Sequence, residues 1–144
     1  MQQAASLPQR IKAFYERVSV ERDAALVDLP ALYGDQVHFI NPVVDQHGLA
    51  AFREAWDTAL RKYKVFKFND VEVIGTDEQF TLVYSMTISF GFGPSFTTDM
   101  ATSCRADGGK VIFLRDYFDP LGSLMQPFGP LNWLYRKVFG LLVA

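Results

Sequence analysis

The stretch 111–118 reads as a strand of mostly apolar residues that carries one carboxylate, Asp116. Successive side chains of a strand point to opposite faces. The neighbours expected on the face of Asp116 are apolar: Ile112, Leu114 and Phe118. A carboxylate among apolar side chains is costly, and burial raises its pKa toward values that are useful in proton transfer. Asp116 is therefore a candidate general acid or base, unless an ion pair with Arg17 or Arg53 makes it structural.

A second polar side chain, Asn41, ends a short predicted strand at 37–41 and precedes Pro42. Alternation places its amide on the same face as the apolar Phe39. If this amide and the Asp116 carboxylate flank one water, they could orient and deprotonate it, which is general-base catalysis. The competing interpretation is that Asn41 caps the bend at Pro42 through its own backbone.

The remaining reactive side chains give no metal site or nucleophile by their spacing. His38 lies on the opposite strand face from Asn41, and His47 lies in the loop before Gly48. Neither histidine has a second ligand at a spacing typical of metal sites, so we predict no metal and no cofactor. Cys104 has no activating histidine in the sequence pattern and reads as a small buried hydrophobe.

Size and composition predict a single domain with a substantial core. The chain has 144 residues, of which 49% are hydrophobic and 15% aromatic. That content is enough for a core and for an apolar cavity. We place the domain core at about 7–119 and an apolar extension at 120–144. The formal net charge of -2 and the lack of a basic run argue against nucleic-acid binding.

The sequence pattern contains no targeting or membrane-spanning signal. The single cysteine cannot form an internal disulfide, which fits a reducing compartment, and we expect a cytoplasmic protein. The first residues lack the charged and apolar regions of a signal peptide. No apolar run approaches the ~20 residues that a membrane-spanning helix requires.

Hydrophobic periodicity predicts helices first and an antiparallel meander afterwards. Apolar residues recur at helical spacing from Leu7 to Val18 and over 49–63, and 23–29 also reads as helical. From about Val65 the period changes to two, which is typical of strands. Four long strands are expected, near 65–74, 79–91, 96–106 and 110–118. This order predicts an α+β fold in which a twisted sheet and helices on one side form a cone with an internal pocket.

The element order and several motifs resemble the NTF2-like superfamily, also called SnoaL-like. The motifs are Leu32-Tyr33-Gly34-Asp35, Phe39-Ile40-Asn41-Pro42, Gly48, Gly109-Lys110-Val111 and Arg115-Asp116-Tyr117-Phe118-Asp119. The resemblance covers roughly 7–119. It implies an α+β roll of the cystatin-like kind, with a curved antiparallel or mixed sheet wrapped around N-terminal helices. It says less about activity, because this fold hosts many functions.

Among the enzymes of the superfamily, limonene-1,2-epoxide hydrolase has the most similar motif. The resemblance implies that Asp116 stands at the position of its water-activating base and Asn41 at that of its water-holding amide. A tyrosine of that enzyme falls at Phe39, and its catalytic arginine and aspartate fall near Thr87 and Ser89. The base is thus matched, whereas the acid that protonates the epoxide oxygen is not.

The resemblance to ketosteroid isomerase is less close. Its general base falls at Asn41, which cannot take a proton at neutral pH. Its oxyanion-hole residues fall near Thr102, whose hydroxyl can donate a hydrogen bond, and near Tyr15 on the first helix. We therefore expect a pocket protein for a small hydrophobic molecule, with hydrolase- or isomerase-type chemistry at Asp116. The alternatives are a non-catalytic ligand-binding module and a dimeric assembly module.

The strand at 79–91 separates into a large apolar face and a face of small hydroxyl side chains. The resemblance directs Thr87 and Ser89 toward the pocket. The apolar face is then covered by a second subunit, in a homodimer through the outer sheet face. The reversed assignment makes the apolar face core and the hydroxyl face solvent-exposed. The ligand-binding residues expected in total are Tyr15, Phe39, Thr87, Ser89, Met100, Thr102, Phe118, Phe128 and Trp133.

The extension 120–144 carries more apolar residues than one buried helix face needs. A helix near 131–142 is too short to span a bilayer. It could cover the open end of the cone, with Phe128 or Trp133 reaching the ligand, or it could pack across a dimer. Contact with a membrane or a partner protein is the interpretation that we favour least.

Overall fold

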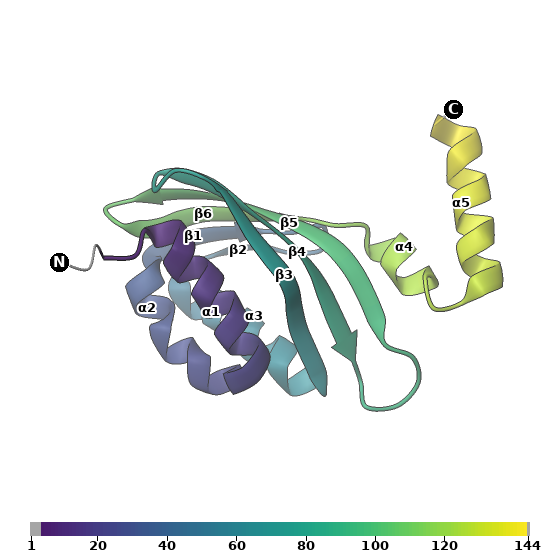
Figure 1. Ribbon diagram of the computed structural model, residues 1–144, viewed down its shortest axis with the longest axis horizontal. Coiled ribbons are helices and arrows are strands. Elements are labelled where there is room, and N and C mark those ends of the chain that lie inside the picture. Colours follow the sequence, from purple (N-terminus) through teal and green to yellow (C-terminus); the bar gives the residue numbers. More distant parts are fainter. Residues whose placement is uncertain (1–3, 144) are drawn as a thin grey trace.

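In a computed structural model that describes residues 4–143, one curved six-stranded sheet wraps over the N-terminal helices (Figure 1). The strands are β1 (Tyr33–Ile40), β2 (Asp45–His47), β3 (Val65–Gly75), β4 (Gln79–Ser89), β5 (Phe96–Asp107) and β6 (Lys110–Tyr117). The helices are α1 (Leu7–Glu21), α2 (Leu29–Leu32), α3 (Leu49–Lys62), α4 (Pro120–Met125) and α5 (Gly129–Val143). A 3₁₀ segment, η1 (Arg22–Asp28), joins α1 to α2.

The sheet has the strand order β2-β1-β6-β5-β4-β3. Strands β1 and β6 run parallel, and the other neighbouring pairs run antiparallel. The four strands from β3 to β6 are consecutive in the chain and form the predicted meander. The sheet does not close on itself, and the predicted α+β fold is confirmed (Figure 1).

Helix α1 begins at a side-chain cap. The Ser6 hydroxyl accepts a hydrogen bond from the Gln9 backbone N–H at 3.4 Å, and Pro8 occupies the first turn. Its buried side lies against the concave face of the sheet, and that side includes Ile11, Phe14, Tyr15 and Val18. The apolar stripe of α1 therefore presents an aromatic side chain, Tyr15, to the interior of the cone.

Helix α3 is tied to the first helical segment through its C-terminal end. The Arg22 guanidinium donates to the backbone carbonyls of Leu60, at 2.6 Å, and Tyr63, at 2.7 Å. A cation that donates to the last carbonyls of a helix satisfies groups that have no partner within the helix. This contact fixes α3 beneath the sheet, where Phe52 and Trp56 are buried.

Register shifts between neighbouring strands shape the sheet, and one of them corrects a predicted face. In β3 the pairing with β4 shifts between Asn69 and Glu72, and Asp70 has a positive φ of 52°. In β6 the partners of Arg105 and Ala106 are Phe113 and Val111, so Ile112 is the extra residue. A bulge inverts the alternation beyond it. Ile112 is consequently exposed rather than on the face of Asp116, and the core positions are Val111 and Leu114.

Strand β4 buries its apolar face, which is the opposite of the orientation favoured by the resemblance. Phe80, Leu82 and Tyr84 belong to the core beneath the sheet. The physical reason is that the apolar stripes of α1 and α3 lie on this side and need large apolar partners. The hydroxyl side chains of β4 thus belong to the outer face of the sheet.

The tail extends from the far end of the sheet, away from α1 and α3 (Figure 1). Asp119 caps α4 by accepting from the Gly122 backbone N–H at 2.9 Å, and it also accepts from the Tyr135 hydroxyl. Helix α5 contacts α4, and no residue of α5 is buried. Among the described residues, no helix has the length and apolar content needed to cross a membrane.

Candidate functional site

A cavity of about 440 Å³ lies between the concave face of the sheet and the helices α1 and α3. Each of the strands β1 to β6 contributes at least one side chain to its wall. Most of the wall is aromatic, and its ring-bearing residues include Tyr15, Phe39, Phe52, Trp56, Phe68 and Tyr84. Glu54 and Lys62 are exposed members of the wall, whereas Asp116 is a partly buried carboxylate within it.

A chain of hydroxyl groups holds Asp116 in this wall. The Thr102 hydroxyl donates to Asp116 Oδ1 at 2.6 Å. The Tyr84 hydroxyl lies 2.8 Å from Thr102 Oγ1. Because the single proton of Thr102 is used on the carboxylate, Tyr84 must be the donor in the second bond. Tyr84 therefore donates to Thr102, and Thr102 donates to Asp116. This hydroxyl relay crosses three neighbouring strands, β4, β5 and β6.

Burial raises the pKa of Asp116 from its ordinary 3.8 to about 6, and the Thr102 hydrogen bond offsets part of that rise. The two arginines that could have paired with it are engaged elsewhere. Arg17 pairs with Glu21 and Asp28, and Arg53 lies 3.8 Å from Asp57. Among residues 4–143 no salt bridge reaches Asp116. The Thr102 bond at Oδ1 is also the one hydrogen bond that its carboxylate accepts from these residues, so Oδ2 accepts none from them.

Asn41 caps the turn that follows β1. Its Oδ1 accepts from the backbone N–H groups of Val43, at 2.8 Å, and Val44, at 2.9 Å. The capping interpretation is therefore confirmed, and the carbonyl oxygen of this amide is not available to a water or ligand. Asn41 still forms part of the cavity wall, so its amide nitrogen is the group that could face a ligand.

The buried tyrosines near Asp116 remain protonated. Desolvation by burial holds the pKa of the Tyr15, Tyr33 and Tyr84 phenols well above the ordinary value, and the neighbouring Asp116 charge adds to this effect. These hydroxyls are therefore hydrogen-bond donors at every pH in ordinary use. The Tyr84 hydroxyl donates its hydrogen bond to Thr102. No such bond to Thr102 engages Tyr15, which also lies in the cavity wall.

Six of the predicted site residues meet at the cavity: Asp116, Asn41, Tyr15, Phe39, Met100 and Phe118. Thr102 is fully buried behind the wall and is linked to the cavity through its hydrogen bonds with Asp116 and Tyr84, which both belong to the wall. Alternation along the strands indicated Asp116, Asn41, Phe39 and Phe118, whereas Tyr15 and Thr102 came from the resemblance to ketosteroid isomerase. Alternation could also have found Tyr84, which shares the apolar face of β4 with Phe80 and Leu82, but the opposite face was preferred.

The other four predicted ligand contacts lie outside the cavity. Thr87 accepts from the Asn69 side-chain amide and bonds to Thr97, both at 3.1 Å, on the outer face of the sheet. Ser89 accepts from the Gly91 backbone N–H at 3.1 Å. Phe128 and Trp133 are exposed in the tail and take no part in the wall. The expected lid is therefore wrong, because the tail leaves the sheet at the end opposite to the helices (Figure 1).

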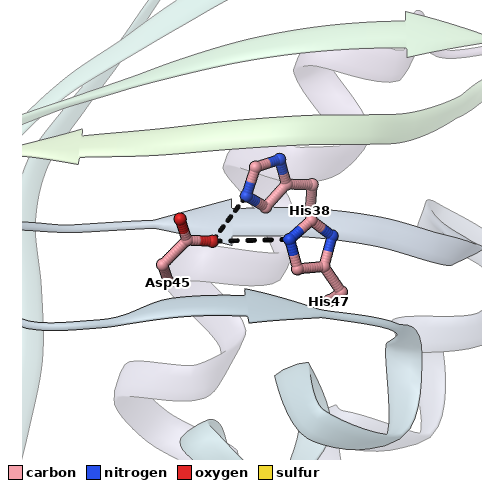
Figure 2. A group of neighbouring side chains, drawn as sticks. All are labelled: His38, Asp45 and His47. Atoms are coloured by element: carbon pink, nitrogen blue, oxygen red, sulfur yellow. Dashed lines mark hydrogen bonds and ion pairs between the residues drawn. The ribbon is translucent and has the colours of Figure 1, made fainter.

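A second group of ionisable side chains lies on the outer side of the β1–β2 hairpin (Figure 2). His38, Asp45 and His47 bring three ligand atoms within 4.8 Å of one another. The sequence gives neither histidine a second ligand at a spacing typical of metal sites, but the fold brings the two histidines and Asp45 together. Sequence spacing missed the group because it forms through the pairing of β1 with β2.

A family model of the SnoaL-like domain matches residues 11–116. No curated protein matches the sequence. Among solved structures, a putative polyketide cyclase from Pseudomonas putida KT2440 has a TM-score of 0.71 at 15% identity, with 85% of this chain and 98% of that chain covered. A putative SnoaL-like polyketide cyclase from Jannaschia sp. CCS1 has a TM-score of 0.68 at 13% identity, over 87% and 96% of the two chains.

A third structure adds a bound small molecule to the comparison. It is a hypothetical protein with a ketosteroid isomerase-like fold from Catenulispora acidiphila DSM 44928, in complex with trimethylamine, and its TM-score is 0.70 at 14% identity. That match covers 87% of this chain and 95% of the other. Identities this low show a shared fold, and the family match extends over most of the present sequence. The chain therefore belongs to the SnoaL-like domain family of the NTF2-like superfamily.

Proposed function

We propose that this chain binds a small hydrophobic molecule in the cavity and that Asp116 acts on it as a general base. The observation that carries the proposal is a partly buried carboxylate, Asp116, in a mostly aromatic wall, which forms no salt bridge with any of residues 4–143. A base with a pKa of about 6 is largely ionised at neutral pH, yet it binds a proton more tightly than an ordinary aspartate. Burial in the cavity wall supplies this basicity.

The hydroxyl relay supports the proposal because it orients the base. Thr102 donates to Oδ1 of Asp116 at 2.6 Å, and Tyr84 orients Thr102 from the next strand. The carboxylate is thereby fixed on three paired strands of the sheet, which are rigid elements. Its Oδ2 is the atom that we assign to proton transfer.

Removal of a proton from carbon fits the cavity better than epoxide opening does. The positions at which epoxide hydrolysis would require an acid and an arginine are Thr87 and Ser89, which lie outside the cavity. Tyr15, in contrast, lies in the wall and keeps its proton. A hydroxyl donor in the same cavity wall as a base suits a ligand whose carbonyl oxygen gains negative charge as the neighbouring carbon loses a proton.

The relatives favour the same class of substrate. The structures from Pseudomonas putida and Jannaschia are described as putative polyketide cyclases. Ring closure in such molecules begins with removal of a proton from a carbon beside a carbonyl group. A cavity of about 440 Å³ suits a molecule of that kind with a few fused rings. We therefore propose an aromatic or polycyclic ketone as the ligand.

The base can be tested without the natural ligand, with 5-nitrobenzisoxazole as the probe. A base takes the proton on its ring carbon, the nitrogen–oxygen bond breaks, and a coloured cyanonitrophenolate forms. We expect the rate to follow ionisation of Asp116, with a midpoint near pH 6. Asp116→Asn should lower the rate by about 100-fold or more, because general-base catalysis contributes on that scale.

The matched control is Asp107→Asn, which removes an exposed carboxylate in the turn between β5 and β6 and keeps a residue suited to that turn. It should leave the rate unchanged. An Asp116→Asn variant as fast as the parent chain would overturn the catalytic proposal. A parent chain that binds the probe but does not convert it would favour the non-catalytic binding module instead.

A further inference from the structure

Pairing of the short hairpin β1–β2 brings together two imidazoles and a carboxylate. His38 and His47 are direct cross-strand partners, and Ile40 pairs with Asp45. The His38 Nε2 atom lies 2.6 Å from Asp45 Oδ1, and the His47 Nε2 atom lies 3.6 Å from the same oxygen. Figure 2 shows both rings directed at this one carboxylate oxygen. Three side chains thus converge on a single point.

This point lies on the other side of the hairpin from the cavity. Phe39 pairs with Gln46, and both residues belong to the cavity wall. Since neighbouring residues of a strand point to opposite faces, the flanking His38 and His47 point outward. The histidine group is therefore a separate feature that the proposed function at Asp116 does not use.

The ligand types and their placement are those of a zinc site with open positions. Zinc is bound in proteins by histidine nitrogen and aspartate oxygen at about 2.0–2.2 Å, which sets tetrahedral ligand atoms ~3.4 Å apart. The 3.6 Å between His47 Nε2 and Asp45 Oδ1 already matches that spacing. The 2.6 Å contact of His38 needs to open by less than ~1 Å, a change that side-chain rotation can supply.

We propose that His38, Asp45 and His47 bind one Zn²⁺ ion or a similar divalent transition metal, with water completing the coordination. Ring packing holds the two imidazoles in place. The two imidazole rings stack with centroids 3.9 Å apart and an interplanar angle of 16°, and Phe113 packs edge-on against His38 at 5.3 Å. All three ligands stand on paired strands, so little freedom is lost when an ion binds.

The composition of the site also selects the class of metal. Two of its three ligands are imidazoles, which suit zinc, copper and nickel, whereas magnesium and calcium prefer oxygen ligands. Arg115 pairs with Ile40 across β1 and β6, so a cation stands on the neighbouring strand. That position disfavours an ion held by charge alone and favours one that bonds to nitrogen.

The sequence makes the test unusually direct. The chain has two histidines, both in this group, and its single cysteine, Cys104, is buried with its thiol pKa raised by desolvation. Nitrogen NMR of the imidazoles and calorimetry on the untagged full chain, stripped with a chelator, can therefore follow zinc chloride addition. We expect one ion per chain and simultaneous changes in both imidazole signals, with no effect of magnesium chloride.

The variants separate this site from adventitious binding. His38→Gln, His47→Gln and Asp45→Asn should each weaken zinc binding by about tenfold or more, because each removes one ligand. Asp35→Asn, an exposed carboxylate on the same strand β1, is the control and should leave the affinity unchanged. Asp116→Asn should also leave it unchanged, so failure here and failure of the proposed function are distinguishable.

Two results would overturn the proposal. One is a parent chain whose imidazole signals do not respond to zinc. The other is zinc binding that all three ligand variants retain at the parent affinity, because the ion would then lie elsewhere. Lower pH should weaken binding in the parent chain, since zinc competes with protons for the imidazole nitrogens.

Discussion

At the scale of single residues, the charge of Asp116 should make the fold less stable at neutral pH. Its pKa is about 6 in the folded chain and 3.8 as the ordinary value, so the folded state holds the proton more tightly. Its contribution to the free energy of unfolding is largest below about pH 4 and is lost as the pH rises through about 6. Asp116→Asn, which is never charged, should therefore be more stable than the parent above that range, by up to about 3 kcal/mol.

Thermal unfolding of both chains across this pH range measures the difference. The gain should shrink below about pH 4, where the parent carboxyl is neutral in both states. Asp107→Asn, on the exposed turn, serves as the control that should show no such dependence. An Asp116→Asn chain that is less stable than the parent at high pH would mean that the carboxylate has a stabilising partner.

The Thr102 hydroxyl should set the acidity of Asp116. Its hydrogen bond lowers the pKa of the carboxyl against the effect of burial. Thr102→Val removes the donor and should move the midpoint of the probe reaction to higher pH, whereas Thr102→Ser should keep it near the parent value. A midpoint that does not move in Thr102→Val would show that the hydroxyl does not control the base.

Single residues were predicted from the sequence where alternation alone decides. The unusual setting of Asp116 and the position of Asn41 beside the same space follow from period two. The relay through Thr102 could not be predicted, because it depends on which residues face one another across β4, β5 and β6. The histidine pair was missed for the same reason, because the register of β1 with β2 cannot be deduced from the spacing of residues in the sequence.

At the scale of elements, substitutions on the two faces of strand β4 test which face of the sheet packs against the core. Leu82 is fully buried, whereas Thr87 bonds to its neighbours on the outer face. Leu82→Ala should cost about 2–5 kcal/mol of stability, as deletions of buried leucine side chains do. Thr87→Ala should cost about 1 kcal/mol or less. Chemical denaturation of the two variants gives the comparison, and equal costs would contradict the assigned faces.

Hydrophobic periodicity predicted the positions of the helices and strands better than it predicted which of their faces are buried. Long helices and long strands were predicted within a few residues of their bounds. Alternation separates two faces of β4 without saying which one meets the helices, and the resemblance favoured the wrong one, with the apolar side outward. The bulge at Ile112 and the three-residue strand β2 have no periodic signal, since one is an extra residue and the other is too short.

At the scale of the whole molecule, a homodimer through the outer sheet face stays a prediction, although the large apolar face of β4 that suggested it is buried in the core. Val83 is 41% exposed in the middle of β4 on the outer face, among small and hydroxyl side chains. Val83→Arg places a charge in the contact and should convert the dimer to a monomer in sedimentation velocity. Val20→Arg, at a position of α1 that is 83% exposed, is the control. A monomeric parent chain would contradict the expectation.

The tail offers the competing surface. The apolar side chains of α5 are exposed, and Trp133 is 62% accessible. Removal of 120–144 should leave both the dimer and probe binding intact if the sheet face is the interface and the cavity is the ligand site. Loss of the dimer in the shortened chain would instead assign assembly to α5.

The most direct test of the central claim is a carbon NMR titration of the aspartate carboxyl groups in the parent chain. Comparison with Asp116→Asn identifies the signal of Asp116. We expect a titration midpoint near pH 6, because the carboxylate is buried in the cavity wall and forms no salt bridge with the described residues. A midpoint near the ordinary value of 3.8 or below would contradict the central claim, since Asp116 would then be too weak a base for the proposed chemistry.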